Sequence, residues 1–135
     1  KDWLKEKPSN SSLLDQLDQP IAYADWLTRD DLMVYVEAFK TSGFTGPLNR
    51  YRAQSLDPQE LPQVVGKRLE QATCLIAGSK DPVRHFIQGV DLYETPADFC
   101  DDYRETTIIE EAGHWVQQEA PEETNRALHA FINSL

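Results

Sequence analysis

The chain has 135 residues, of which 40% are hydrophobic and 10% aromatic, which is enough apolar material for one compact domain. Its 23 acidic residues outnumber its 13 lysines and arginines and give a net charge of −10 at pH 7. No cluster of basic residues interrupts this acidic background to neutralise phosphates, so the composition excludes a nucleic acid as the partner.

No apolar stretch approaches the roughly 20 residues that span a bilayer, and residues 1–8 lack the apolar core of a signal peptide. We therefore expect no membrane partner. The two cysteines, Cys74 and Cys100, match no metal spacing and no disulfide framework, so we expect two reduced thiols in a cytoplasmic protein. The three histidines are widely separated, and neither a metal site nor a cofactor is expected.

The first 25 residues are polar and interrupted by prolines, with one short helix expected around 13–17. Thr28 has the character of a helix N-cap, because Asp31 follows three residues later as in a capping box. Apolar residues then recur at helical spacing until Gly43 ends the helix. They are Leu32, Tyr35, Val36 and Phe39.

After a glycine-containing turn over 44–47, a second helical piece is expected through Tyr51 and is broken by Pro58. Residues 56–71 are typical of a connector. The run 73–77 is short and apolar and is bounded by a glycine, which is typical of a strand buried in a parallel sheet.

A second strand is expected over 105–110, where two isoleucines form the apolar centre. The stretch between the two strands is of mixed character, and we expect it to hold a helix that begins near Pro82 or Pro96. Pro121 suits the first position of a final helix, in which acidic residues of the first turn complement the helix dipole. The apolar face of that helix consists of Ala127, Leu128, Phe131, Ile132 and Leu135.

This order of helices, strand, helix, strand and helix predicts an α/β fold with a parallel sheet. Two strands alone leave unpaired edges, so we expect an incomplete sheet that residues outside this chain complete. Three parts are expected: a helical segment at 1–55, a connector at 56–71 and an α/β part at 72–135.

An acid and a histidine follow the two expected strands, Asp81 in Gly-Ser-Lys-Asp-Pro and His114 in Gly-His-Trp. The carboxyl ends of parallel strands meet at one edge of a sheet, so both side chains should emerge there. A carboxylate that orients an imidazole is half of a hydrolytic triad. No Gly-x-Ser-x-Gly elbow occurs in the 135 residues, so the chain looks like the second half of an enzyme.

These two motifs, together with the segment Ser-Gly-Phe-Thr-Gly-Pro-Leu-Asn-Arg-Tyr-Arg at 42–52, resemble the C-terminal part of the epoxide hydrolases of the α/β-hydrolase fold. The resemblance runs from within the cap domain to the end of the catalytic core. It implies that Asp81 is the orienting acid, His114 the general base and Tyr51 one of two cap tyrosines. Arg50 departs from the family, which usually has an aromatic residue before that tyrosine.

The resemblance further implies that a small apolar epoxide is hydrolysed to a vicinal diol through an alkyl-enzyme ester. The nucleophilic aspartate, the oxyanion loop and the second cap tyrosine would lie outside this chain. The implied partners are therefore the epoxide and the N-terminal part of the same enzyme, while a homodimer stays open.

Each of these residues has a second interpretation. Asp81 stands before a proline, which is also a common signal for a turn or a helix cap. Tyr51 could simply pack at core-like helical spacing, and His114 could be a structural histidine of a surface loop. His85 is the alternative base if His114 is misplaced.

Two alternatives also stay open for the function. One is a haloalkane dehalogenase or esterase of the same fold, which its nucleophile would distinguish. The other, motivated by the missing nucleophile, is a non-catalytic chain that is stable only against a partner chain.

Overall fold

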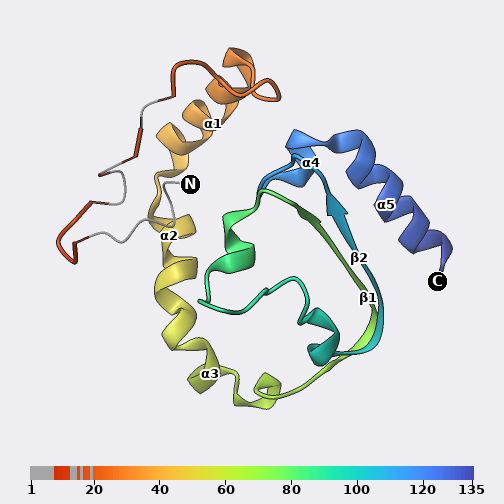
Figure 1. Cartoon of the computed structure of the whole chain (residues 1–135). Coiled ribbons are helices and arrows are strands. Elements are labelled where there is room, and N and C mark those ends of the chain that lie inside the picture. Colours follow the sequence, from red (N-terminus) through yellow and green to blue (C-terminus); the bar gives the residue numbers. More distant parts are fainter. Residues whose placement is uncertain (1–7, 13–14, 16, 19) are drawn as a thin grey trace. The chain divides into compact units, whose positions relative to one another are not determined.

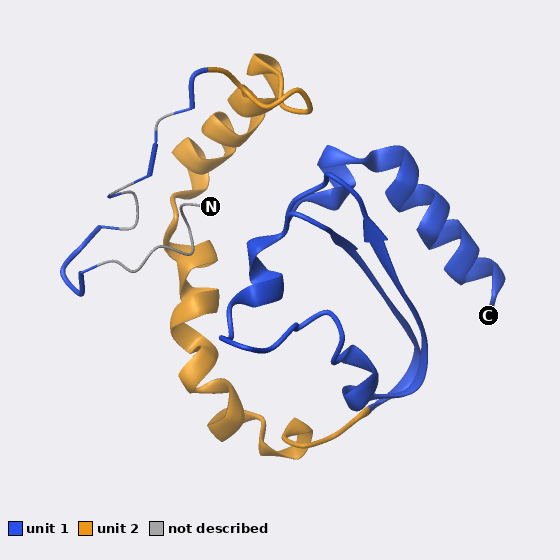
Figure 2. Ribbon diagram, in the orientation of Figure 1, with its two compact units in different colours: residues 1–21, 69–135 blue, residues 22–68 orange. Residues whose placement is uncertain are grey.

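The computed structural model describes residues 8–12, 15, 17–18 and 20–135, and the chain divides into two compact units (Figures 1 and 2). Residues 22–68 form the helical unit. Residues 69–135, together with the N-terminal residues up to 21, form the strand unit. The helix expected around 13–17 depends on positions 13, 14 and 16, which lie outside the described residues.

In the helical unit, α1 (Arg29–Ser42) confirms the first expected helix and both of its ends. The Asp31 amide donates a hydrogen bond to Thr28 Oγ1 at 3.1 Å, and the Thr28 amide donates to the Asp31 carboxylate at 3.0 Å. This reciprocal pair satisfies two backbone donors at the start of the helix. Gly43 ends the helix with a φ of 67°, a conformation that favours glycine, and its amide donates to the Phe39 carbonyl.

The second helix, α2 (Thr45–Arg52), begins earlier than expected. Residues 45–47, which were predicted as a turn, form its first helical turn. Pro47 is tolerated there because the amides of the first turn have no acceptor within the helix. The expected connector contains the short helix α3 (Asp57–Glu60) and a 3₁₀ turn at Pro62–Val64. The two prolines of the connector therefore lie in the first turns of new short helices.

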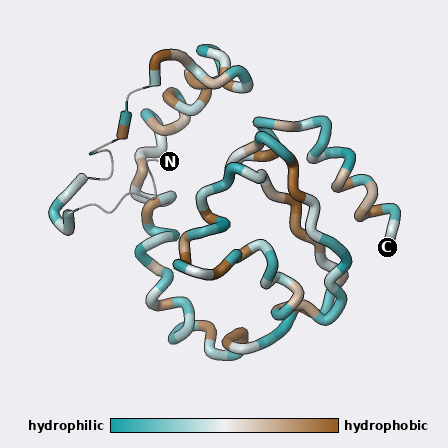
Figure 3. The backbone as a smooth tube through the Cα atoms, in the orientation of Figure 1, coloured by the Kyte–Doolittle hydropathy of each residue, from teal (hydrophilic) through white to brown (hydrophobic). Residues whose placement is uncertain are grey.

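In the strand unit, the two expected strands pair in parallel as β1 (Leu69–Gly78) and β2 (Cys100–Ile109). Figure 1 shows them side by side, and Figure 3 shows hydrophobic stretches along both. Both strands begin several residues before the apolar runs that predicted them. The first residues of β1 are exposed, and backbone pairing there does not need apolar side chains.

The prediction of a helix between the two strands is wrong. The structure has only short 3₁₀ turns at the two prolines, over Pro82–His85 and Pro96–Phe99. Between them the loop folds back on itself: the Leu92 amide donates to the Arg84 carbonyl at 3.0 Å, and the Arg84 guanidinium pairs with Asp91 at 2.6 Å. These long-range bonds replace the local ones that a helix would make.

The last expected helix is confirmed as α5 (Pro121–Asn133), and the short helix α4 (Val116–Glu119), which was not expected, precedes it. A small buried core of Ile109, Ala112 and Val116 joins these helices to the end of β2. The hydroxyl of the buried Thr124 donates to the Val116 carbonyl at 2.9 Å. This core therefore lies on both sides of residue 114 in the sequence and supports the loop that carries it.

Among the residues that the structure describes, no helix is both long and apolar enough to cross a membrane. The same residues contain no group of histidine, cysteine and acidic side chains that could hold a metal ion. Cys74 and Cys100 are both thiols.

Candidate active site

Asp81 and His114 meet at the carboxyl edge of the strand pair, as their positions after the strands predict. His114 Nδ1 lies 2.8 Å from Asp81 Oδ2. When Nδ1 carries the proton, the imidazole donates to the carboxylate and Nε2 is left to accept a proton. Asp81 is only 5% exposed, whereas the His114 side chain is 51% exposed. A buried carboxylate thus orients an imidazole that solvent or a ligand can reach.

Backbone hydrogen bonds join the two loops and set the acid relative to the base. The Ser79 amide donates to the Ile109 carbonyl, and the Lys80 amide donates to the Ala112 carbonyl, each at 2.9 Å. The Glu111 amide donates to Ser79 Oγ at 3.0 Å, and the Lys80 ammonium pairs with the Glu111 carboxylate. The position of Asp81 is therefore tied to the segment that leads to His114.

Gly78 allows the two loops to approach this closely. A Cβ atom at this position would lie 2.2 Å from the carbonyl oxygens of both Ala112 and Gly113. These are backbone atoms, which cannot swing aside as the end of a flexible side chain can. Any side chain at residue 78 would therefore displace the loop that carries His114.

Glu119 holds the backbone on both sides of His114. The Gly113 amide donates to Glu119 Oε2 at 2.7 Å, and the Trp115 amide donates to Glu119 Oε1 at 3.0 Å. One carboxylate on α4 thus satisfies two loop amides. Sequence reasoning missed this residue; the available signal was an acid one helical turn after a loop whose amides have no strand partner.

Three donors surround the Asp81 carboxylate. The Val83 amide donates to Oδ1 at 2.8 Å, and the Tyr93 hydroxyl donates to Oδ2 at 2.5 Å, the oxygen that also contacts His114. Burial by itself raises the pKa of the Asp81 carboxyl, but the bonds from Tyr93, His114 and the Val83 amide outweigh burial and lower that pKa below its usual value. The carboxylate is therefore ionised at neutral pH.

Tyr93 was not singled out from the sequence, because it lies in a stretch without periodicity. Burial, followed by the bond to Asp81, raises the pKa of the Tyr93 phenol far above its usual value, so the phenol keeps its proton and remains a donor. The signal that could have found it is Asp91, two residues earlier, whose Oδ1 accepts the Tyr93 amide at 3.0 Å.

The remaining sequence candidates lie elsewhere. His85 is exposed at the end of its 3₁₀ turn, and Asp81 is engaged by His114, so the geometry favours His114 over His85 as the base. Tyr51 lies on α2 in the helical unit and is 70% exposed. Its neighbour Arg50 pairs with Asp57 at 3.0 Å, an exposed ion pair that links α2 to α3.

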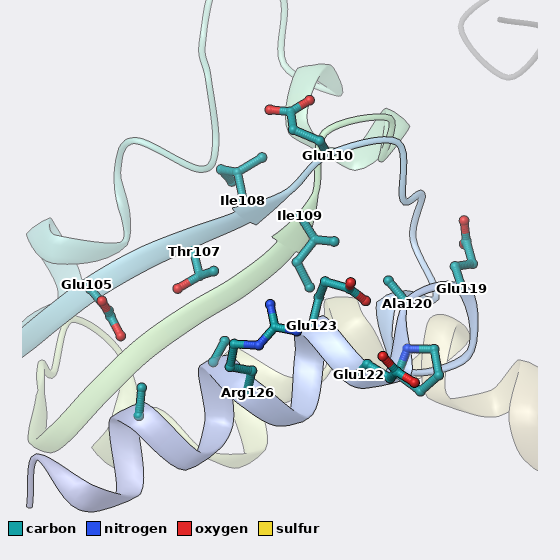
Figure 4. A pocket seen from close by; sticks show the side chains of 13 residues that line it. Glu105, Thr107, Ile108, Ile109, Glu110, Glu119, Ala120, Glu122, Glu123 and Arg126 are labelled. Atoms are coloured by element: carbon teal, nitrogen blue, oxygen red, sulfur yellow. The ribbon is translucent and has the colours of Figure 1, made fainter.

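A groove of about 890 Å³ runs along β2 and α5 (Figure 4). Its walls include Ile109 from the strand and Arg126 from the helix, with several glutamates around them. Neither Asp81 nor His114 lines it. A groove between a strand and a helix is not specific to any chemistry, whereas a buried acid bonded to an imidazole is typical of hydrolytic sites, so we assign the site to that pair.

No protein-family model matches the chain. The chain is 38% identical over 123 residues to epoxide hydrolase B of Mycobacterium tuberculosis, covering 91% of this chain and 34% of that protein. It is 34% identical over 128 residues to epoxide hydrolase A of the same organism, covering 95% of this chain and 38% of that protein. The crystal structure of epoxide hydrolase A from Mycobacterium thermoresistibile matches with a TM-score of 0.81 at 34% identity, over 94% of this chain and 39% of the other.

The chain thus spans little more than a third of the length of the relatives that it matches. Its structural neighbours are α/β-hydrolase epoxide hydrolases, which confirms the predicted fold class and the incomplete sheet. The chain corresponds to the C-terminal part of an epoxide hydrolase-like protein of the α/β-hydrolase fold.

Proposed function

We propose that this chain supplies the general base, its orienting acid and a cap phenol to an enzyme that hydrolyses epoxides to vicinal diols. The observation that carries the proposal is the 2.8 Å contact between His114 Nδ1 and the buried Asp81 carboxylate, with the His114 side chain half exposed. The relatives named epoxide hydrolase support it.

The first chemical step is ring opening by a carboxylate nucleophile from outside these 135 residues. One carboxylate oxygen attacks an epoxide carbon, the bond from that carbon to the ring oxygen breaks, and the ring oxygen takes a proton from the Tyr51 phenol. The products are an ester between enzyme and substrate and a phenolate that solvent reprotonates. A phenol suits this role because it stabilises an alkoxide without bringing a full charge into an apolar pocket.

The second step is hydrolysis of that ester. His114 Nε2 removes a proton from water as the water oxygen attacks the ester carbonyl, and Asp81 stabilises the imidazolium that forms. The acyl–oxygen bond then breaks, and the departing alkoxide takes the proton back from His114. The diol leaves, and the carboxylic acid that remains loses its proton to solvent, which restores the carboxylate nucleophile.

The proposal extends to the organisation and surroundings of the protein. We assign 1–55 to the cap, 56–71 to a connector that contains the second boundary between the compact units, after residue 68, and 72–135 to the catalytic core. The N-terminal part of the same enzyme is the partner that completes the sheet, and the substrate is a small apolar epoxide. The two thiols support a cytoplasmic location. Light scattering of the full-length protein would show whether a homodimer forms.

The decisive experiment is His114→Gln in the full-length protein with styrene oxide as the probe. Loss of the base should stop ester hydrolysis but leave ring opening intact, so intact-protein mass spectrometry should show the protein plus one epoxide. His129→Gln on the exposed face of α5 is the matched control and should turn over without an adduct. Unchanged turnover by His114→Gln would end the proposal.

The same preparations separate the alternatives of the same fold. A haloalkane and a nitrophenyl ester, assayed beside the epoxide, should both be processed far more slowly. Faster release of halide or nitrophenol than of diol would assign the chain to a dehalogenase or an esterase instead. No turnover of any of the three would favour the non-catalytic interpretation.

A further inference from the structure

We propose that Tyr93 is a positioning residue for the acid–base pair, because its hydroxyl and the His114 imidazole share one oxygen of Asp81 and together aim the carboxylate at the base. This inference rests on the proposed function for its catalytic meaning. The contact itself can be measured without any assay of turnover.

The geometry gives the Asp81 carboxylate little freedom. Oδ2 accepts from Tyr93 at 2.5 Å and from His114 at 2.8 Å, while Oδ1 accepts from the Val83 amide at 2.8 Å. A carboxylate oxygen has two lone-pair sites, so these two donors occupy both sites on Oδ2. Rotation of the carboxylate would break at least one of the three bonds. Tyr93 therefore opposes the rotation that would turn Oδ2 away from the imidazole.

The loop that delivers Tyr93 is itself held in place. The Arg84 guanidinium donates twice to Asp91 Oδ2, at 2.8 Å from Nε and 2.6 Å from Nη2, and the Tyr93 amide donates to Asp91 Oδ1 at 3.0 Å. The Arg84 and Asp91 side chains are only 26% and 19% exposed. Because a half-buried ion pair precedes it in the chain, the Tyr93 phenol is directed toward Asp81 rather than left free on the surface.

A neutral donor suits this position better than a cation would. A lysine or arginine at residue 93 would also bind the carboxylate, but its charge would oppose the imidazolium that forms next to the same carboxylate. The phenol donates a hydrogen bond without adding net charge, and its raised pKa keeps its proton in place. The other titratable groups near this contact include Lys80, Arg84, His85, Asp91 and Glu94 on the loop and Glu119 on α4.

The test compares Tyr93→Phe with Tyr103→Phe in the full-length protein. Tyr103 is the matched control, because it is also half-buried and its hydroxyl bonds to one side chain, that of Thr106, on β2. The first measurement is the titration of the Asp81 carboxyl carbon by NMR, with the signal identified by its loss in Asp81→Asn. Tyr93→Phe removes one of three donors and leaves burial unchanged, so the titration should move to higher pH by about half a pH unit or more.

The second measurement separates the two chemical steps by rapid mixing with styrene oxide. His114 acts only on the ester, so Tyr93→Phe should slow ester hydrolysis about tenfold or more while ring opening keeps its rate, and the ester should accumulate. Tyr103→Phe should change neither rate. A purely structural role for Tyr93 would slow both steps together.

A second variant keeps the folded structure and should shift the Asp81 titration in the opposite direction. Difluorotyrosine placed at residue 93 keeps the ring and strengthens the donor, so the Asp81 titration should move to lower pH. An Asp81 titration that both variants leave unchanged would overturn the inference, as would equal slowing of both steps by Tyr93→Phe. If the titration moves as expected but the wild-type protein opens no epoxide, the contact stands and the proposed function fails.

Discussion

The carboxylate of Asp81 and the imidazole of His114 are separated by 33 positions in the chain and by 2.8 Å in space. The reason is that each follows one strand of a parallel pair, so the connection between the strands is long while the loops at their ends are neighbours. The contact is buried on the side of the acid and open on the side of the base. Such an arrangement is suited to activating a water molecule that arrives from outside.

We predict that Gly78→Ala destabilises the protein and impairs turnover together. The new methyl group would lie 2.2 Å from two backbone carbonyl oxygens, so the His114 loop must move. Overpacking of this kind costs about 1–3 kcal/mol of the free energy of unfolding, which urea titration measures.

Gly46→Ala is the matched control for that change. Residue 46 lies in α2, and a Cβ there would meet nothing within 4 Å outside its own chain neighbours and helix backbone. The gain of about 0.5–1 kcal/mol in helix propensity is opposed by crowding of the new β-carbon against the Pro47 ring, so this variant should be close to the parent in stability. Equal stability of Gly78→Ala and the parent would show that the loops are not in close contact.

Glu119→Ala should loosen the loop around His114. It leaves the part-buried Gly113 amide without its acceptor, which costs about 1–3 kcal/mol of the free energy of unfolding, whereas water can reach the exposed Trp115 amide. Ester hydrolysis should slow as well, because the imidazole is less well held. Glu119→Gln retains only one acceptor oxygen. Its free energy of unfolding and its rate of ester hydrolysis should lie between those of Glu119→Ala and the parent.

Gln117→Ala on the exposed side of the same short helix α4 controls for helix propensity. It should change neither the urea midpoint nor the rate of ester hydrolysis. A Glu119→Ala protein indistinguishable from Gln117→Ala would contradict the role of Glu119 as the holder of this loop.

Stability should fall on the acid side through Asp81. The folded-state pKa of this carboxyl is lowered, so its contribution is complete above the unfolded pKa of about 4 and is lost as pH falls through the folded value. The difference in urea midpoint between the parent and Asp81→Asn should therefore be largest near neutral pH and shrink below about pH 4. Asp25→Asn, at an exposed position, is the control; a pH-independent difference for Asp81→Asn would contradict the prediction.

Tyr51→Phe should slow ring opening and leave ester hydrolysis unchanged, which is the opposite split from Tyr93→Phe. In the proposed mechanism the Tyr51 phenol donates its proton only when the epoxide oxygen leaves. Rapid mixing with styrene oxide measures both rates. Tyr23→Phe, at another exposed tyrosine of the helical unit, should change neither. An unchanged ring-opening rate in Tyr51→Phe would remove Tyr51 from the mechanism.

Local signals predicted the elements that carry them. The capping box of Thr28 and Asp31 gave the start of α1 correctly, and Pro121 gave the start of α5. The apolar runs located the centres of β1 and β2 but not their beginnings, because strand pairing continues through exposed polar residues. The helix expected between the strands failed because the loop makes its bonds between Arg84 and Asp91, which no local pattern records.

The residues of the candidate site also fall into those that the sequence predicted and those that it missed. Asp81 and His114 could be paired from the sequence, since each directly follows a strand and parallel strands bring such positions together. Their catalytic roles, and that of Tyr51, stay predictions. Tyr93 and Glu119 were missed, because each acts through a contact that forms only once the loops have folded, and the local signals beside them are weak.

The register of the strand pair, in which Gly78 lies opposite Ile109, limits how this site can evolve. Strands slide against each other only in whole steps, and a slip of one residue turns every side chain to the other face. Natural selection therefore cannot adjust the distance from acid to base gradually by shifting the sheet. Fine adjustment has to come from substitutions around the two loops, where Ser79, Tyr93 and Glu119 hold Asp81 and His114 in place.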